Sequence, residues 1–209
     1  MKEEILNKIH QGDSLEFMRG LPDKCIDLVL TDPPYGLGDR LSDGGGKLKN
    51  TPMAVLYRDT DWVDVVPSEE VFAEMFRVSK NQIICGGNYF NLPPTRGFIC
   101  WDKKQHMPTL SACEYIWTSF DCPAKIISCT STDLNRKHPT QKPVYLMQKL
   151  IQKFSKEGEI ILDCYMGSGT TAIAAKMLGR NFIGVEKEQK YVDIANQRIA
   201  ELDTQPSIF

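Results

Sequence analysis

The sequence predicts an α/β fold, with a doubly wound, mostly parallel sheet covered by helices on both faces. Short apolar runs alternate with helix-like segments along the 209 residues, as in chains built from parallel strands and crossover helices. The run Ile160–Cys164 leads through a glycine turn into the helix-like Thr170–Leu178, and the next run, Phe182–Glu186, ends in a carboxylate. This order is typical of folds that bind a nucleotide-like ligand at the carboxyl edge of the sheet.

The other elements follow from hydrophobic periodicity. We expect strands at Ile5–Ile9, Ile26–Thr31, Gln82–Cys85, Gly97–Asp102 and Glu114–Trp117. We expect helices at Leu15–Arg19, Ser68–Val78, Val144–Phe154 and Glu188–Leu202. Residues 1–209 are expected to form a single domain, because this length and a hydrophobic content of 42% are sufficient for one sizeable core.

The segment Asp32-Pro33-Pro34-Tyr35 directly follows an expected strand. An exocyclic amino nitrogen delocalises its lone pair into the ring, so a catalyst must bind its hydrogens and let it become pyramidal. Asp32 can accept one hydrogen, and the carbonyl of Pro33 can accept the other because prolines stiffen this backbone. Tyr35 offers a ring for stacking. The same residues are also compatible with an ordinary proline turn in which Asp32 is a turn or cap residue.

The glycine turn Gly167-Ser168-Gly169 lies at the start of a helix. Glycines there let the backbone approach a ligand closely at a helix N-terminus. A phosphate-binding P-loop needs a lysine before its Ser or Thr, and Thr170 follows Gly169 directly, so ATP and GTP are not expected. Glu186 stands where doubly wound folds bind a ribose diol, which favours a nucleoside-containing cofactor.

Together these segments resemble the DNA amino-methyltransferases that use S-adenosylmethionine, in the beta arrangement where the catalytic segment precedes the cofactor glycine loop. Ile9–Ser14 looks like the family's acidic segment near the cofactor adenine, and His138–Pro143 looks like its segment near the methionine moiety. The resemblance covers nearly the whole chain. It implies a Rossmann-like methyltransferase sheet in circularly permuted order, with a terminal antiparallel hairpin over Gly97–Trp117.

The resemblance also implies two sets of site residues. The catalytic set is Asp32, Pro33, Pro34 and Tyr35. The set that binds S-adenosylmethionine is Asp13, His138, Thr140, Lys142, Asp163, Tyr165, Gly167, Ser168, Gly169, Thr170 and Glu186. Taken singly, some have structural explanations: Asp13 and Glu186 could each cap the helix that follows, and His138 and Lys142 could be solvated surface residues.

The implied reaction is site-specific methyl transfer to the N6 amino group of adenine in a flipped-out nucleotide, as in restriction-modification systems. Asp at the first position of the four-residue motif is more typical of the adenine enzymes and Ser of the cytosine-N4 enzymes, so adenine is favoured and cytosine N4 is the alternative. Methylation of RNA adenine or protein glutamine, and a noncatalytic DNA-binding subunit, are further alternatives. The recognition sequence and a cognate restriction enzyme cannot be read from the chain.

Double-stranded DNA is the expected partner, although the net charge of -2 is not basic. Residues 96–142 hold 7 Lys and Arg against 4 Asp and Glu, so a basic surface would be local. Residues 36–60 are expected to form a mobile loop beside the active site, and residues 118–137 a short target-recognition segment. A homodimer would widen the DNA footprint. The expected DNA contacts are Arg40, Lys47, Lys49, Lys103, Lys104, Arg136 and Lys137.

The seven cysteines form no C-x-x-C pair, and the three histidines lack metal-ligand spacing. We therefore expect reduced thiols and no metal. No run is long enough to span a membrane, and the N-terminus does not resemble an export signal, so a cytoplasmic location without membrane partners is expected.

Overall fold

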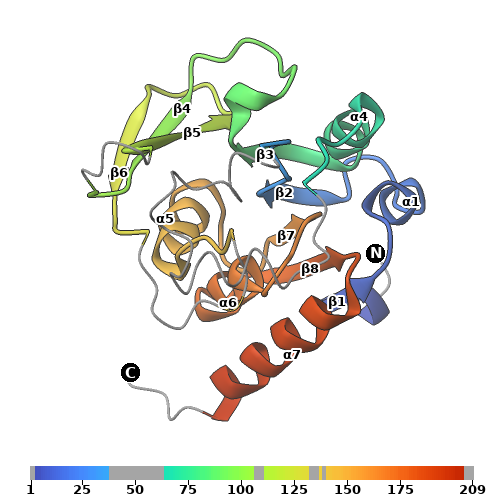
Figure 1. Ribbon diagram of the computed structural model, residues 1–209. Coiled ribbons are helices and arrows are strands. Elements are labelled where there is room, and N and C mark those ends of the chain that lie inside the picture. Colours follow the sequence, from blue (N-terminus) through green and yellow to red (C-terminus); the bar gives the residue numbers. More distant parts are fainter. Residues whose placement is uncertain (1–2, 38–63, 106–110, 132–136, 138–139, 205–209) are drawn as a thin grey trace.

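The computed structural model describes residues 3–37, 64–105, 111–131, 137 and 140–204. They form one eight-stranded sheet with helices on both faces (Figure 1). The strands are β1 (Lys8–Gln11), β2 (Ile26–Thr31), β3 (Ser79–Cys85), β4 (Phe98–Asp102), β5 (Cys113–Thr118), β6 (Lys125–Ser128), β7 (Ile160–Asp163) and β8 (Asn181–Glu186). The α-helices are α1 (Ser14–Arg19), α4 (Glu69–Val78), α5 (Val144–Phe154), α6 (Thr170–Met177) and α7 (Gln189–Thr204), with short 3-10 helices η1 (Glu3–Ile5) and η2 (Gly87–Tyr89).

The strand order is β1-β8-β7-β2-β3-β5-β4-β6. The strands from β1 to β3 in this order are all parallel, and β5 is antiparallel to both β3 and β4. This confirms the mostly parallel doubly wound sheet and the antiparallel hairpin. Because β5 runs against its neighbours, its first residues lie at the edge where the parallel strands end.

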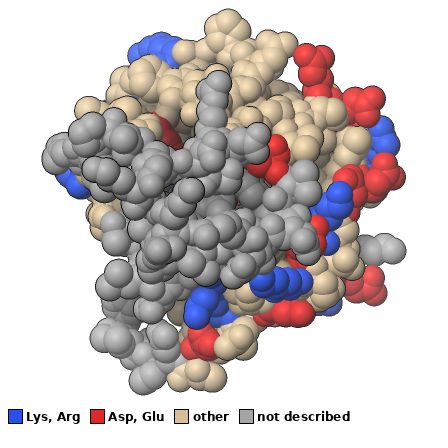
Figure 2. Space-filling view, viewed as in Figure 1, with Lys and Arg blue, Asp and Glu red and all other residues tan. Residues whose placement is uncertain are grey.

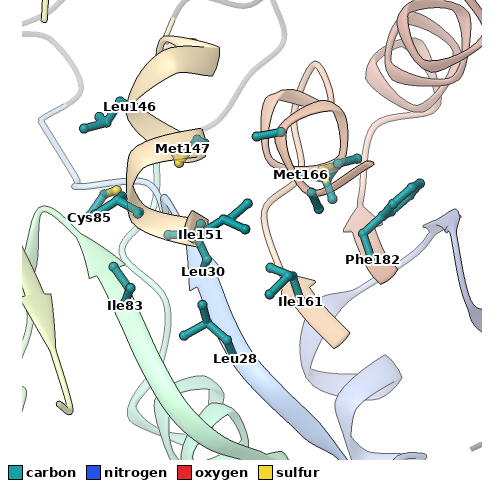
Figure 3. Packing of buried hydrophobic residues seen from close by; sticks show 14 of the residues in the cluster. Leu28, Leu30, Ile83, Cys85, Leu146, Met147, Ile151, Ile161, Met166 and Phe182 are labelled. Carbon is teal, nitrogen blue, oxygen red and sulfur yellow. The ribbon is translucent and has the colours of Figure 1, made fainter. Parts of the chain in front are cut away.

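Successive residues of the central strands face two different cores, which is why both faces of the sheet carry helices. Leu28 and Leu30 of β2 pack with α5, α6 and α7, whereas Val29 packs with α1 and α4. Figure 3 shows the first core, where Met147 and Ile151 of α5 lie over β2 and β3. The two layers hold β2 and β7 rigidly side by side.

Three elements differ from the expectations by more than two residues. The first strand begins at Lys8 rather than at Ile5, because Asn7 has a φ of 57° and separates η1 from β1. Strand β3 begins at Ser79, immediately after α4, rather than at Gln82. A short strand at Lys125–Ser128 was not expected; it pairs with β4 in parallel and therefore extends the sheet beyond the hairpin.

Three further features concern the cysteines, possible metal sites and possible membrane-spanning helices. All seven cysteines are free thiols. Among the described residues, no His, Cys, Asp or Glu cluster could hold a metal ion. Within the same part of the chain, no helix is long and apolar enough to cross a membrane.

Candidate active site

The expected catalytic and cofactor segments meet at one edge of the sheet. Strands β1, β8, β7 and β2 are parallel neighbours, so the residues at their carboxyl ends lie along the same edge. Asp32 follows β2, while Asp163 and Glu186 are the last residues of β7 and β8. Parallel pairing therefore unites motifs that are more than 130 residues apart in the sequence.

Asp32 accepts hydrogen bonds from two side chains. Lys142 Nζ lies 2.8 Å from its Oδ1 and 2.7 Å from its Oδ2, and the Tyr35 hydroxyl donates to Oδ1 at 2.5 Å. Lys142 Nζ is also 3.3 Å from Glu114 Oε2, and Lys103 Nζ is 2.5 Å from Glu114 Oε1. Two carboxylates and two ammonium groups thus form one chain of opposite charges, which we call the Asp32 cluster.

Burial decides the electrostatics of this cluster. It raises the pKa of Asp32, and the positive charge of Lys142 only partly offsets this. Burial also opposes the charge on Lys142, but Asp32 and Glu114 outweigh it and raise the pKa of the ammonium, so Lys142 stays protonated. For Glu114 burial is again the largest effect, yet Lys142 and Lys103 together lower its pKa. The cluster therefore keeps Lys142 charged next to Asp32.

The Tyr35 ring stacks on Tyr89, with centroids 4.8 Å apart and an interplanar angle of 17°. Lys142 Nζ lies 5.2 Å from the Tyr35 centroid. Burial, followed by the charge of Asp32, raises the pKa of the Tyr35 hydroxyl, so it remains a donor to Asp32. Gly86 has a φ of 67°, and a Cβ there would lie 2.3 Å from the Tyr35 ring, so glycine is needed for this packing.

Asp163 is buried and fully engaged by the protein. Its Oδ1 accepts from the Thr31 hydroxyl at 2.7 Å and from the Tyr165 amide at 3.0 Å, and its Oδ2 accepts from the Thr171 hydroxyl at 2.6 Å. Burial raises its pKa to about 6. The carboxylate thus ties β2, the glycine turn and α6 together, and we interpret it as a positioning residue for the cofactor loop.

The glycine turn divides into ligand-facing and packing residues. Gly167 donates its amide to Glu186 Oε2 at 2.8 Å, and both Gly167 and Thr170 line the cavity described below. The Ser168 hydroxyl instead donates to Gln141 Oε1 at 2.8 Å. Gly169 has a φ of 85° and does not line the cavity; a Cβ there would lie 2.8 Å from Ala195 Cβ, so this glycine is needed for packing against α7.

Asp13 and Glu186 each combine a structural role with a position at the cavity. Asp13 caps α1 by accepting from the amides of Leu15 and Glu16, and Glu186 accepts from the amide of Glu188 at 2.9 Å. Burial raises the pKa of Glu186. Both residues line the cavity. For Asp13 the expected cap, and for Glu186 a contact in the turn before α7, therefore coexist with a position at the cavity.

A cavity of about 560 Å³ opens at this edge, within the usual size range of ligand pockets. Its lining includes expected catalytic residues and most of the expected cofactor residues: Asp13, Asp32, Pro33, Pro34, Tyr35, Thr140, Lys142, Asp163, Tyr165, Gly167, Ser168, Thr170 and Glu186. The Thr170 Oγ1 is buried and has no hydrogen-bond partner within the described part of the chain. A buried hydroxyl without a partner at a helix N-terminus fits the binding of a polar ligand.

Several expected residues lie elsewhere. His138, Arg40, Lys47, Lys49 and Arg136 are outside the described residues, as are positions 38–60 of the expected loop over residues 36–60. Lys103 has 16% side-chain exposure, and its ammonium is paired with Glu114. Lys104 is 60% exposed and pairs with Asp102, and Lys137 is exposed. Figure 2 shows the described basic side chains scattered among acidic ones on this face, without one continuous basic patch.

The structure adds residues that the sequence analysis did not assign to the site. Glu114 joins the Asp32 cluster, and Thr31 and Thr171 hold Asp163. Gln141 connects the segment before α5 to Ser168, whose carbonyl accepts from Arg198. A charged residue at the start of an otherwise apolar strand was the available signal for Glu114. The hydroxyl contacts depend on strand pairing and leave no signal in the sequence.

Comparison with known proteins agrees with this geometry. Residues 100–197 match the model of a DNA methylase family. The type II methyltransferase M.HinfI of Haemophilus influenzae is 28% identical, over 99% of this chain and 73% of its own length. The type II methyltransferase M2.DpnII of Streptococcus pneumoniae is also 28% identical, over 92% of this chain and 90% of its own length.

Solved structures show the same fold. The M1.HpyAVI complex with S-adenosylmethionine superimposes with a TM-score of 0.59 at 24% identity, covering 92% of this chain and 98% of that one. The cytosine-N4-specific PvuII DNA methyltransferase gives a TM-score of 0.63 at 16% identity, covering 96% and 87%. The shared motifs, their convergence on one cavity and these matches make the chain similar to DNA methylases in sequence and in fold.

Proposed function

We propose that this protein transfers a methyl group from S-adenosylmethionine to the N6 amino group of adenine in double-stranded DNA. The observation that carries the proposal is that Asp32 and the glycine turn line one cavity. Asp32, which can bind amino hydrogens, thus lines the same cavity as the glycine turn, which can bind a nucleoside. The match to the DNA methylase family supports the DNA substrate.

The cofactor end of the cavity fits S-adenosylmethionine through its own residues. Glu186 and Asp13 supply carboxylates for hydroxyl and amino donors, and the Thr170 hydroxyl lacks a protein partner among the described residues. When bound there, S-adenosylmethionine supplies a methyl group on a sulfonium, which is already activated for transfer. Asp163 keeps the glycine turn in place from beneath.

The catalytic end acts on the base. A target nucleotide must leave the DNA stack to reach the cavity, at a cost of a few kcal/mol. Tyr35 provides a stacking surface that returns roughly 1–3 kcal/mol of this cost. Asp32 accepts one amino hydrogen and the Pro33 carbonyl accepts the other. As the amino nitrogen gains the methyl group and becomes positive, the negative charge of Asp32 stabilises it. The donor sulfonium would leave as a neutral thioether, and the methylated nitrogen would lose its extra proton to solvent.

The choice of adenine depends on the first residue of the catalytic segment, which is Asp32 in this chain. Cytosine N4 presents the same amino chemistry and is the second candidate, because a cytosine-N4-specific enzyme shares the fold. Exposed Lys104 and Lys137, together with Arg40, Lys47, Lys49 and Arg136, are the proposed phosphate contacts. A dimer and a cytoplasmic location remain predictions.

The decisive experiment is methyl transfer with isotopically labelled S-adenosylmethionine. DNA, RNA and protein are tested in parallel, and the methylated DNA is digested to nucleosides and analysed by mass spectrometry. The proposal expects labelled N6-methyladenine from DNA alone. N4-methylcytosine would overturn the choice of base, and label only in RNA or protein would overturn the DNA substrate. Failure to bind S-adenosylmethionine would point to a noncatalytic subunit.

A further inference from the structure

The Asp32 carboxylate is occupied in this structure by the protein itself. Both of its oxygens accept hydrogen bonds from Lys142, and Oδ1 also accepts one from Tyr35. A substrate amino group must use an oxygen of Asp32, and its nitrogen becomes positive during the reaction. An ammonium in the same place competes for the lone pairs and repels the developing charge. Lys142 as it lies here therefore competes with the target base for Asp32.

Lys142 also contacts the stacking residue. Its Nζ donates a 3.1 Å hydrogen bond to the Tyr35 hydroxyl and lies 5.2 Å from the centroid of the ring, and Tyr89 is stacked on the same ring. The lysine side chain is only 7% exposed. Its charge needs another acceptor inside the protein, because an unpaired buried charge is very costly.

Glu114 provides that acceptor. Its Oε1 is fixed by Lys103 at 2.5 Å, whereas Oε2 is buried, makes no hydrogen bond among the described residues and lies 3.3 Å from Lys142 Nζ. A normal charged hydrogen bond is 2.7–2.9 Å long, so a shift of a few tenths of an ångström would complete it. The four-carbon stem of lysine allows such a shift. Glu114 does not line the cavity, so it acts only through Lys142.

We propose that Lys142 is a displaceable occupant of the amino-group site and that Glu114 is the positioning residue that receives it when the target base enters. In the free protein Lys142 holds the Asp32 carboxylate in place. When a base enters, Lys142 moves towards Glu114 Oε2, its hydrogen bonds to Asp32 weaken, and an oxygen of Asp32 becomes available to the amino group. This inference rests on the proposed function, because it assigns the incoming group as a base amino group.

The test is Glu114→Gln. The amide removes the negative charge, so Lys142 keeps Asp32 as its one full counter-charge and competes more strongly with the base. We expect the KM for DNA to rise on the order of tenfold or more, the size of a lost charge-assisted contact. Affinity for S-adenosylmethionine should not change. Fluorescence of 2-aminopurine, placed at the target position of a DNA fragment that the wild type methylates, should report weaker flipping without any methyl transfer.

The control is Glu74→Gln. Glu74 has 18% side-chain exposure against 17% for Glu114, and it is likewise paired with a cation, Arg77, but on α4. This variant should retain the wild-type KM, kcat and 2-aminopurine signal. If Glu114→Gln does not fold, Glu114→Asp preserves the charge with a shorter reach and should show a smaller rise in KM.

A double-mutant cycle separates positioning from structure. With Lys142→Met as the background, Glu114→Gln should have no further effect on the KM for DNA or on the 2-aminopurine signal. If Glu114→Gln raises the KM equally with and without Lys142, or leaves it at the wild-type value, the inference is wrong. A wild-type protein that methylates no DNA would instead disprove the proposed function, which is a distinct result.

Discussion

The Thr31 hydroxyl donates a 2.7 Å hydrogen bond to Asp163 Oδ1, and this contact joins the strand that carries the catalytic segment to the strand that carries the cofactor loop. Both residues are buried, and they lie at the ends of the adjacent strands β2 and β7. Thr171 and the Tyr165 amide complete the set of donors. The relative positions of Asp32 and the glycine turn therefore depend on one buried carboxylate.

That carboxylate should make stability depend on pH. Burial raises the pKa of Asp163 from 3.8 to about 6 in the folded protein. Between these values the folded protein holds a proton that the unfolded chain has released, so this residue's contribution to stability falls as pH rises. Asp163→Asn cannot titrate. Between about pH 4.5 and 7.5 we therefore expect the wild type to lose about 2 kcal/mol of unfolding free energy relative to the variant. Urea unfolding at several pH values measures it, and a constant difference would contradict the assignment.

Thr170 and Thr171 are neighbours with opposite expected effects. Thr171→Val removes the donor to Asp163 Oδ2 and should lower the free energy of unfolding by about 1–3 kcal/mol. Thr170→Val removes a hydroxyl that has no partner among the described residues, so stability should be retained. Its affinity for S-adenosylmethionine should instead fall about three- to tenfold, because Thr170 lines the cavity and its buried hydroxyl has no partner within the described part of the chain. Calorimetric binding and urea unfolding of both variants test the pair, and equal stability losses would refute it.

Asp32→Ala should abolish most methyl transfer. The substitution removes both the acceptor for the amino hydrogens and the charge that stabilises the positive nitrogen. We expect kcat to fall by about 10²–10³-fold or more, as when one preorganised group is lost. Because Asp32 is hydrogen-bonded to Lys142 and Tyr35 rather than to the glycine turn, S-adenosylmethionine should bind as tightly as before. Single-turnover kinetics with labelled cofactor measure the rate of methyl transfer, and a near-normal rate would show that Asp32 is not required for catalysis.

The sequence was sufficient to predict the sheet and the edge where the candidate cavity opens. β2 and α5 have the expected bounds. Segments with a clear hydrophobic pattern and well-marked ends are the easiest to predict from sequence. The first strand was misplaced because Asn7 adopts a left-handed conformation that composition does not reveal. Strand β6 was missed because four residues at a sheet edge, with Ile126 73% exposed, carry little hydrophobic signal.

The contacts inside the site were harder to predict than its location. Lys142 was expected at the methionine end of the cofactor, and the structure places its ammonium on Asp32, 110 residues away in sequence. The antiparallel register of β5 brings Glu114 to the same edge, and motif spacing contains no information on that register. Gly169 was expected to approach the cofactor, whereas the structure shows it packed against Ala195 of α7.

Gly169 and Gly158 allow this packing role to be measured. Both have a positive φ, 85° and 79°, so alanine at either position costs about 1–2 kcal/mol of backbone strain. A Cβ at Gly158 would meet no atom within 4 Å, whereas one at Gly169 would meet Ala195 Cβ at 2.8 Å and Cα at 3.1 Å. Gly169→Ala should therefore lose about 1–3 kcal/mol more stability than Gly158→Ala, which is the usual cost of overpacking. It should also weaken S-adenosylmethionine binding, since displacement of α7 would shift the turn that carries Gly167 and Thr170. Urea unfolding and binding calorimetry on both variants would test this, and equal losses would mean that the contact with α7 is not what requires glycine.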